Sequence, residues 1–135
     1  AMVGRIDEAL ADVDRCLPLC EGDAGAALRL GRFEILIGVD PDRAFQELDR
    51  VIAEPTTPDL TLLHGVDMLC QVAKNVAEPE TRDASCRHAM TLLELLLKRG
   101  YLRQPGNLER LLANPAVAVL REQAGFDELL ARAGR

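Results

Sequence analysis

The fold of this chain is decided by residues 86–101, which read C-R-H-A-M-T-L-L-E-L-L-L-K-R-G-Y, and by residues 114–130, which read N-P-A-V-A-V-L-R-E-Q-A-G-F-D-E-L-L. The first segment predicts a long amphipathic helix, because its apolar side chains recur every three to four residues. Gly100 is the expected residue just after the helix end, where glycine adopts a left-handed backbone without strain. The second segment predicts short helical pieces that fold back over that helix.

The second segment has the residues that such a fold-back requires. Asn114-Pro115 is expected to start a helical turn, and Gly125 permits a tight bend. Arg121 is expected to fold across the turn and donate hydrogen bonds to carbonyl oxygens or to a carboxylate. Without this cover the apolar face of the long helix would promote aggregation. Three apolar residues are predicted to lie on that face: Phe126, Leu129 and Leu130.

The composition favours a helical protein with an acidic surface. Leu and Ala, both strong helix formers, dominate the 135 residues, and aromatic residues make up only 3%. The net charge is −6, with −7 on residues 1–60 and +1 on residues 61–135. This balance disfavours binding to nucleic acid, because such proteins usually present a basic face. No apolar run approaches the length needed to span a membrane.

Four more helices are expected before these segments, each with a start or stop signal. Asp23 and Asp40 are N-cap candidates, because an Asp side chain accepts hydrogen bonds from the exposed N–H groups of a first helical turn. Pro55 stops a helix, since proline lacks an N–H and clashes with the preceding turn. Gly38 is the expected glycine after the second helix. The predicted spans are residues 4–17, 24–37, 40–55 and 58–77, followed by 79–99.

The apolar stripes of the helices over residues 24–37, 58–77 and 79–99 are wide and cover more than one face. A helix with apolar side chains on two faces has neighbours on both. The expected fold is therefore all-α, with antiparallel helical hairpins stacked as in a solenoid. A simple helical bundle is the alternative.

Residues 4–17 and 40–55 share a pattern that resembles the second helix of a tetratricopeptide repeat (TPR). Each has a small residue where two helices approach closely, an apolar residue four positions later, another three positions further, and a proline at or after its end. The matching residues are Ala9, Val13 and Cys16 in the first span and Ala44, Leu48 and Val51 in the second.

The C-terminal half carries a more specific resemblance. It looks like the tail of the TPR region attached to planctomycete-type bacterial serine/threonine protein kinases, in which a repeat ending in Gly-Tyr precedes a short helix and an Asp-Pro pair. Asn114 stands where Asp is usual in those tails and keeps the capping role. The other matching residues are Gly100-Tyr101, Pro115, Leu120-Arg121, Phe126 and Leu129-Leu130.

The resemblance implies a TPR-like α-α superhelix with a short-helix cap. Residues 2–135 would form a single domain with degenerate repeat helices over 2–57, a last hairpin over 58–104 and the cap over 105–135. It also implies a non-catalytic protein–protein interaction module, a C-terminal fragment of a larger cytoplasmic bacterial signalling protein whose kinase lies elsewhere. The expected partner is a protein or peptide. A purely structural solenoid cap, or a segment that forms a homodimer, is the alternative.

No residue pattern of catalysis is present. The sequence has no kinase Gly-rich loop, H-R-D or D-F-G segment, and no phosphate-binding G-x-x-x-x-G-K-[ST] loop. The chain is therefore expected to be no enzyme and to bind no cofactor.

A metal site is also disfavoured, although four side chains of ligand type remain: Cys16, Cys20, His64 and His88. Pro18 distorts the spacing of the first two cysteines, and the histidines are predicted on separate helices. Cys70 and Cys86 fall on apolar helix faces, where Cys packs as a small hydrophobe. We expect these two to be buried, reduced thiols of a cytoplasmic protein.

One polar arrangement is a candidate binding surface. Side chains at intervals of three, four and three residues occupy one face of the helix over residues 58–77, opposite its apolar stripe. The TPR resemblance implies that this helix and the one over 24–37 line the concave groove in which peptides bind. An ordinary solvated face is the alternative. The groove residues predicted on this basis are Arg29, Arg32, His64, Asp67, Gln71 and Lys74.

Overall fold

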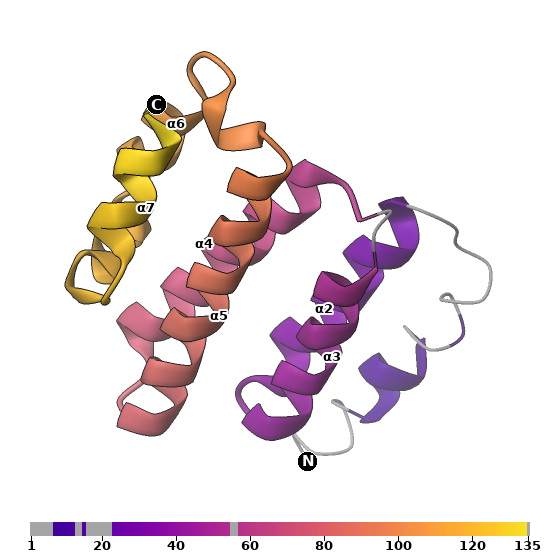
Figure 1. Cartoon of the computed structure of the whole chain (residues 1–135). Coiled ribbons are helices and arrows are strands. Elements are labelled where there is room, and N and C mark those ends of the chain that lie inside the picture. Colours follow the sequence, from indigo (N-terminus) through magenta and orange to yellow (C-terminus); the bar gives the residue numbers. More distant parts are fainter. Residues whose placement is uncertain (1–6, 13–14, 16–22, 55–56, 135) are drawn as a thin grey trace. The chain divides into compact units, whose positions relative to one another are not determined.

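The computed structural model describes residues 7–12, 15, 23–54 and 57–134, and within 23–54 the side chains are described from residue 28 onward. All regular structure in these residues is helical, which confirms the all-α prediction. The chain divides into two compact units, Ala1–Thr61 and Leu62–Arg135. Figure 1 shows the helices of each unit.

The first unit is built on a helical hairpin. Residues 7–12 are helical, and the hairpin consists of α2 (Asp23–Leu36) and α3 (Pro41–Ala53), which pack together. In the turn between them, the Leu36 carbonyl oxygen accepts from the backbone N–H groups of Val39 at 2.9 Å and Asp40 at 2.7 Å. Gly38 does not have the positive φ expected of a closing glycine. That part of the prediction is wrong, because the two hydrogen bonds close the turn without a left-handed residue.

The start of α3 follows the predicted capping chemistry. Asp40 is the N-cap, and its Oδ1 accepts from the Arg43 backbone N–H at 3.3 Å. Pro41 occupies the first turn, where a missing N–H costs nothing. One side of α3 packs against α2, with the rings of Phe33 and Phe45 tilted at 53° and their centroids 6.0 Å apart. The described core of this hairpin comprises Leu30, Phe33, Leu36, Ala44, Phe45, Leu48 and Val51.

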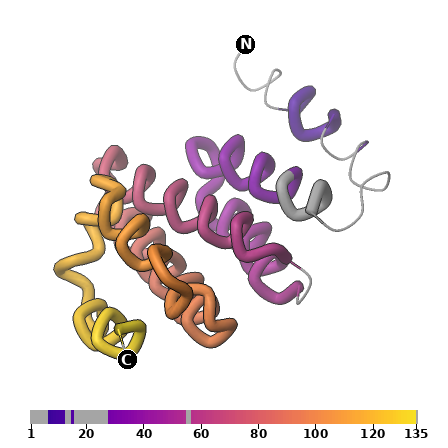
Figure 2. Tube along the Cα trace, turned by 90° about the horizontal axis from the view of Figure 1, so that it is seen from above, coloured from indigo at the N-terminus to yellow at the C-terminus, as the bar shows by residue number. Residues whose placement is uncertain are grey.

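The second unit contains two long helices and a series of short ones. α4 (Asp59–Asn75) and α5 (Pro79–Lys98) lie side by side in the views of Figures 1 and 2. They are followed by η2 (Tyr101–Arg103), α6 (Asn107–Ala113), η3 (Pro115–Glu122) and α7 (Phe126–Ala133). The buried leucines of the long helices are Leu62, Leu69, Leu92, Leu93, Leu96 and Leu97.

Glycines in the left-handed conformation turn the chain where the sequence predicts. Gly100 has φ +86° directly after the C-cap of α5, and Gly125 has φ +89° directly before α7. An L-residue would be strained at both places. Both α7 and η3 contact α5, and Phe126 and Leu129 are buried. Short C-terminal helices therefore lie against the last long helix as predicted, while Leu130, the third residue predicted on that face, is half-buried.

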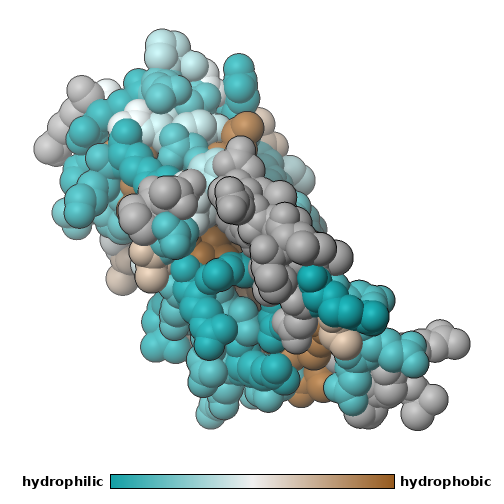
Figure 3. Space-filling view, turned by 90° about the vertical axis from the view of Figure 1, so that its right-hand side faces the viewer, coloured by the Kyte–Doolittle hydropathy of each residue, from teal (hydrophilic) through white to brown (hydrophobic). Residues whose placement is uncertain are grey.

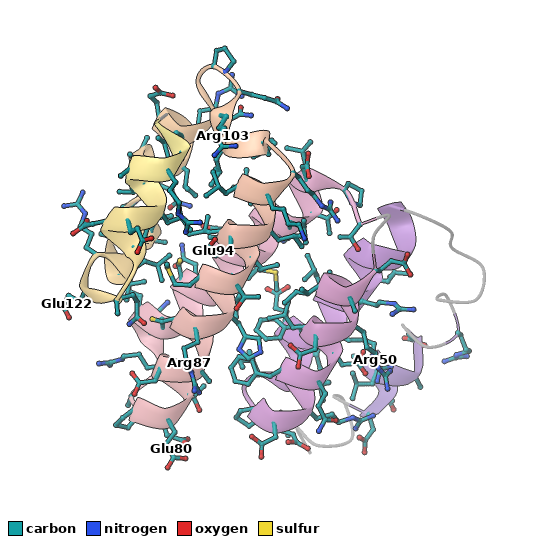
Figure 4. All side chains as sticks on the ribbon, viewed as in Figure 1. Arg50, Glu80, Arg87, Glu94, Arg103 and Glu122 are labelled. Atoms are coloured by element: carbon teal, nitrogen blue, oxygen red, sulfur yellow. The ribbon has the colours of Figure 1, made fainter. Side chains whose placement is uncertain are left out.

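The side-chain hydrogen bond between α7 and α5 comes from an arginine whose role the sequence does not predict. Arg121 is exposed and makes no hydrogen bond or ion pair among the described residues, so its predicted role is wrong. Arg132, in the last turn of α7, donates from Nη2 to Glu94 Oε1 on α5 instead. That hydrogen bond raises the pKa of Arg132 above its ordinary value. Figure 4 shows Glu94 on the side of α5 that is turned toward α7.

Candidate functional site

The polar stripe on α4 has the arrangement that its spacing predicts. Residues three and four apart share one face of a helix. His64, Gln71 and Lys74 are exposed, while the opposite face of α4 buries Leu62, Val66, Leu69 and Ala73. The stripe offers an imidazole, an amide and an ammonium group to solvent. These groups can bind peptide carbonyls and carboxylates through hydrogen bonds and charge.

Asp67, in the middle of the stripe, is half-buried and has a partner from the cap. Asn114 donates from Nδ2 to Asp67 Oδ1 at 2.7 Å, across 47 positions of sequence. The Oδ1 of Asn114 also accepts from the Ala116 backbone N–H at 3.1 Å, as the predicted capping role requires. An amide can donate and accept together, whereas an ionised Asp at position 114 could only accept. The sequence predicted the cap but not the contact with α4.

The two predicted groove residues of α2 are placed differently. Arg29 is half-buried, but Arg32 is buried, with its Nη2 3.1 Å from Glu47 Oε1 on α3. The Nη1 of Arg50 lies 3.7 Å from the same oxygen. The prediction placed Arg32 on a solvent-lined groove, whereas its side chain is 7% exposed and joins α2 to α3. Its chemistry in the structure is that of an internal ion pair.

Cys70 and Cys86 are buried free thiols, as their positions on apolar faces predict. Burial above all, with smaller contributions from Cys86 and Asp67, raises the pKa of Cys70 to about 12. Burial also raises the pKa of Cys86. The thiolate is the nucleophilic form, so neither side chain is activated for attack.

The remaining candidate metal ligands do not gather where the structure describes them. His64 is exposed, and His88 is half-buried with Nδ1 2.8 Å from the Ala84 carbonyl oxygen of its own helix. Cys16 and Cys20 lie outside the described residues. Within the described ranges, no group of three or more His, Cys, Asp or Glu side chains could hold a metal ion.

The described surface has few large apolar side chains. On the face drawn in Figure 3, hydrophilic residues predominate and hydrophobic atoms emerge only in small areas. The described exposed large hydrophobics are Val39, Leu60 and Leu112, one in each of three different segments. Among the residues that the structure covers, no helix has both the length and the apolar character to cross a membrane.

No family, curated protein or solved structure matches this chain in the comparisons with known proteins. The TPR resemblance therefore stays a prediction from the residues quoted above. The site rests on geometry alone: an exposed polar stripe on α4, fixed at its centre by a side chain of the cap.

The contact between Asp67 and Asn114 supplies a testable prediction. Asn114→Asp keeps an oxygen for the Ala116 N–H but sets a second carboxylate against Asp67. We expect the free energy of unfolding at pH 7 to fall by about 1 kcal/mol. The double variant Asp67→Asn/Asn114→Asp rebuilds the contact with its donor and acceptor exchanged and should recover most of the loss. Urea unfolding followed by the fluorescence of Tyr101, the one tyrosine in a chain without Trp, measures both. A double variant as unstable as the single one would contradict this prediction.

Proposed function

We propose that this chain is a non-catalytic protein–protein interaction module of TPR-like architecture. It is the C-terminal part of a larger cytoplasmic bacterial signalling protein, with a serine/threonine kinase in another region. The observation that carries the proposal is the exposed stripe of His64, Gln71 and Lys74 on a helix whose other face is buried. A protein or peptide segment is the occupant that this surface fits.

Two features support binding over simple solvation. Asp67 is held by Asn114, so the centre of the stripe is fixed before any partner arrives. A fixed surface loses less side-chain entropy on binding than a mobile one. In addition, this hydrogen bond joins α4 to the residue that begins η3, 47 positions away in the sequence. The buried thiols and the absence of catalytic motifs in the sequence favour a binding role over an enzymatic one.

The test compares two surface variants of the full chain, each used as bait in a pull-down. His64→Ala/Gln71→Ala/Lys74→Ala should lose most of the bound partner in a quantitative pull-down from bacterial lysate. The control Arg87→Ala/Thr91→Ala removes the same charge from the exposed side of α5 and should retain it. Both should melt like the parent chain by circular dichroism. Equal retention of partner by the triple variant and the control would refute the α4 surface.

A structural role is the second candidate, and the cap itself favours it. η3 and α7 cover α5, as the end of a helical array requires. If that were the whole function, deleting residues 105–135 would cost solubility and leave partner binding unchanged. Dimerisation is a variant of the same role, and sedimentation of the chain would detect it.

A further inference from the structure

A second surface lies at the end of α5, where residues 98–110 connect it through η2 to α6. This segment contains four of the chain's 16 basic residues and one of its 22 acidic residues. It is therefore strongly cationic in a chain with a net charge of −6. The segment belongs to the second unit and is separate from the α4 stripe in sequence.

The backbone of this segment is fixed. Gly100 and Gly106 have φ of +86° and +84°. In this left-handed backbone conformation any other residue would be strained. Asn107 is buried, and its Nδ2 donates to the Tyr101 carbonyl oxygen at 2.8 Å and to Gln104 Oε1 at 3.3 Å. These two hydrogen bonds join the first residue of α6 to Tyr101 and Gln104 on the preceding part of the loop. The backbone that bears the cations therefore has a defined conformation before any ligand binds.

Three of the cations are exposed: Lys98, Arg103 and Arg110. Their side chains make no hydrogen bond or ion pair with any residue that the structure describes. The guanidinium of Arg110 reaches back toward the loop, with Nη2 4.0 Å from the place that a Cβ on Gly106 would occupy. Figure 4 shows Arg103 beyond the C-terminal end of α5, beside the same loop.

A helix-dipole role explains only part of this arrangement. Cations near a helix C-terminus are stabilised by the partial negative charge there, and Lys98 fits that role in the last turn of α5. Arg110 does not, because its guanidinium turns away from the α6 C-terminus toward Gly106. The loop thus holds charged groups that the fold itself does not neutralise.

We propose that this cationic loop docks a segment rich in Asp and Glu from a partner protein. Guanidinium groups present paired N–H donors that match the two oxygens of a carboxylate. The proposal rests on the function proposed above, an interaction module, but places acidic recognition on residues 98–110 and not on α4. Phosphate backbones fit less well, because proteins that bind them usually present a broad basic face, whereas this chain has a net charge of −6 and its exposed cations here lie on one short segment.

The experiment uses the full chain and a fluorescein-labelled deca-glutamate peptide, with binding followed by fluorescence anisotropy at low ionic strength. Arg103→Gln/Arg110→Gln should weaken binding about fivefold, the effect of two exposed ion pairs. Arg87→Gln/Arg121→Gln removes the same charge from two other exposed arginines and should weaken binding less than about twofold. Added salt should reduce binding of the parent chain.

Three results would overturn the proposal: no binding of the peptide, equal losses in the two double variants, or tighter binding of a labelled oligothymidylate of equal length. The His64/Gln71/Lys74 triple variant should bind the peptide like the parent chain. A failure of the loop assignment therefore leaves the α4 test untouched. Circular dichroism melts confirm that each variant is folded.

Discussion

Phe126→Ala is expected to lower the free energy of unfolding of the Leu62–Arg135 unit by about 3–5 kcal/mol. Phe126 is the first residue of α7 and is 2% exposed. Its removal leaves a cavity beneath the cap, between elements that pack on α5. The loss is large because α7 spans only eight residues and has little stability without its buried side chains.

Tyr101 fluorescence during urea unfolding measures this effect, since Tyr101 lies in η2 of the same unit. Leu112→Ala is the control, because Leu112 is 42% exposed and its truncation should change the stability by less than about 0.5 kcal/mol. If Phe126→Ala and Leu112→Ala had equal effects, α7 would not be packed as described.

The second large effect is expected in the first unit. Arg32→Met leaves the Glu47 carboxylate buried, and Arg50, at 3.7 Å, is then the one cation beside it among the residues that the structure describes. Breaking such a pair from one side costs about 3 kcal/mol, because a desolvated charge remains without its main partner.

Arg32→Met/Glu47→Leu removes both charges and fills the space with apolar atoms. It should recover most of the lost stability, since apolar pairs of similar volume often replace buried ion pairs without cost. Native-state hydrogen exchange of the α2 and α3 amides measures the stability of this hairpin directly. A double variant less stable than the single one would show that the two side chains do not form a coupled pair.

Local backbone chemistry made several parts of the fold predictable. Asp40, Asn114, Gly100 and Gly125 each act through groups within a few residues, so the sequence alone indicates their roles. Gly38 was mispredicted because a helix can also be closed by backbone hydrogen bonds, which need no special residue. Composition and periodicity were sufficient for the all-α class.

The side-chain contacts between distant elements could not be predicted. The pairs Asn114–Asp67 and Arg132–Glu94 depend on how the cap lies on the long helices, and spacing in sequence does not encode that. The prediction for Arg32 comes from the TPR resemblance, which implies that the helix over residues 24–37 lines a groove. The signal that could have corrected it is Glu47, an opposite charge at a position flanking the apolar stripe of the neighbouring helix.

The cap must be folded onto α5 if Asn114 is to reach Asp67 on α4 and if η3 and α7 are to cover the last long helix. Methyl–methyl nuclear Overhauser effects in a chain with labelled Leu, Val and Ala test this directly. We predict cross-peaks between Leu129 or Ala133 of α7 and the buried leucine methyl groups of α5. A spectrum of the folded chain with no cross-peaks between residues 126–133 and residues 79–98 would contradict the account.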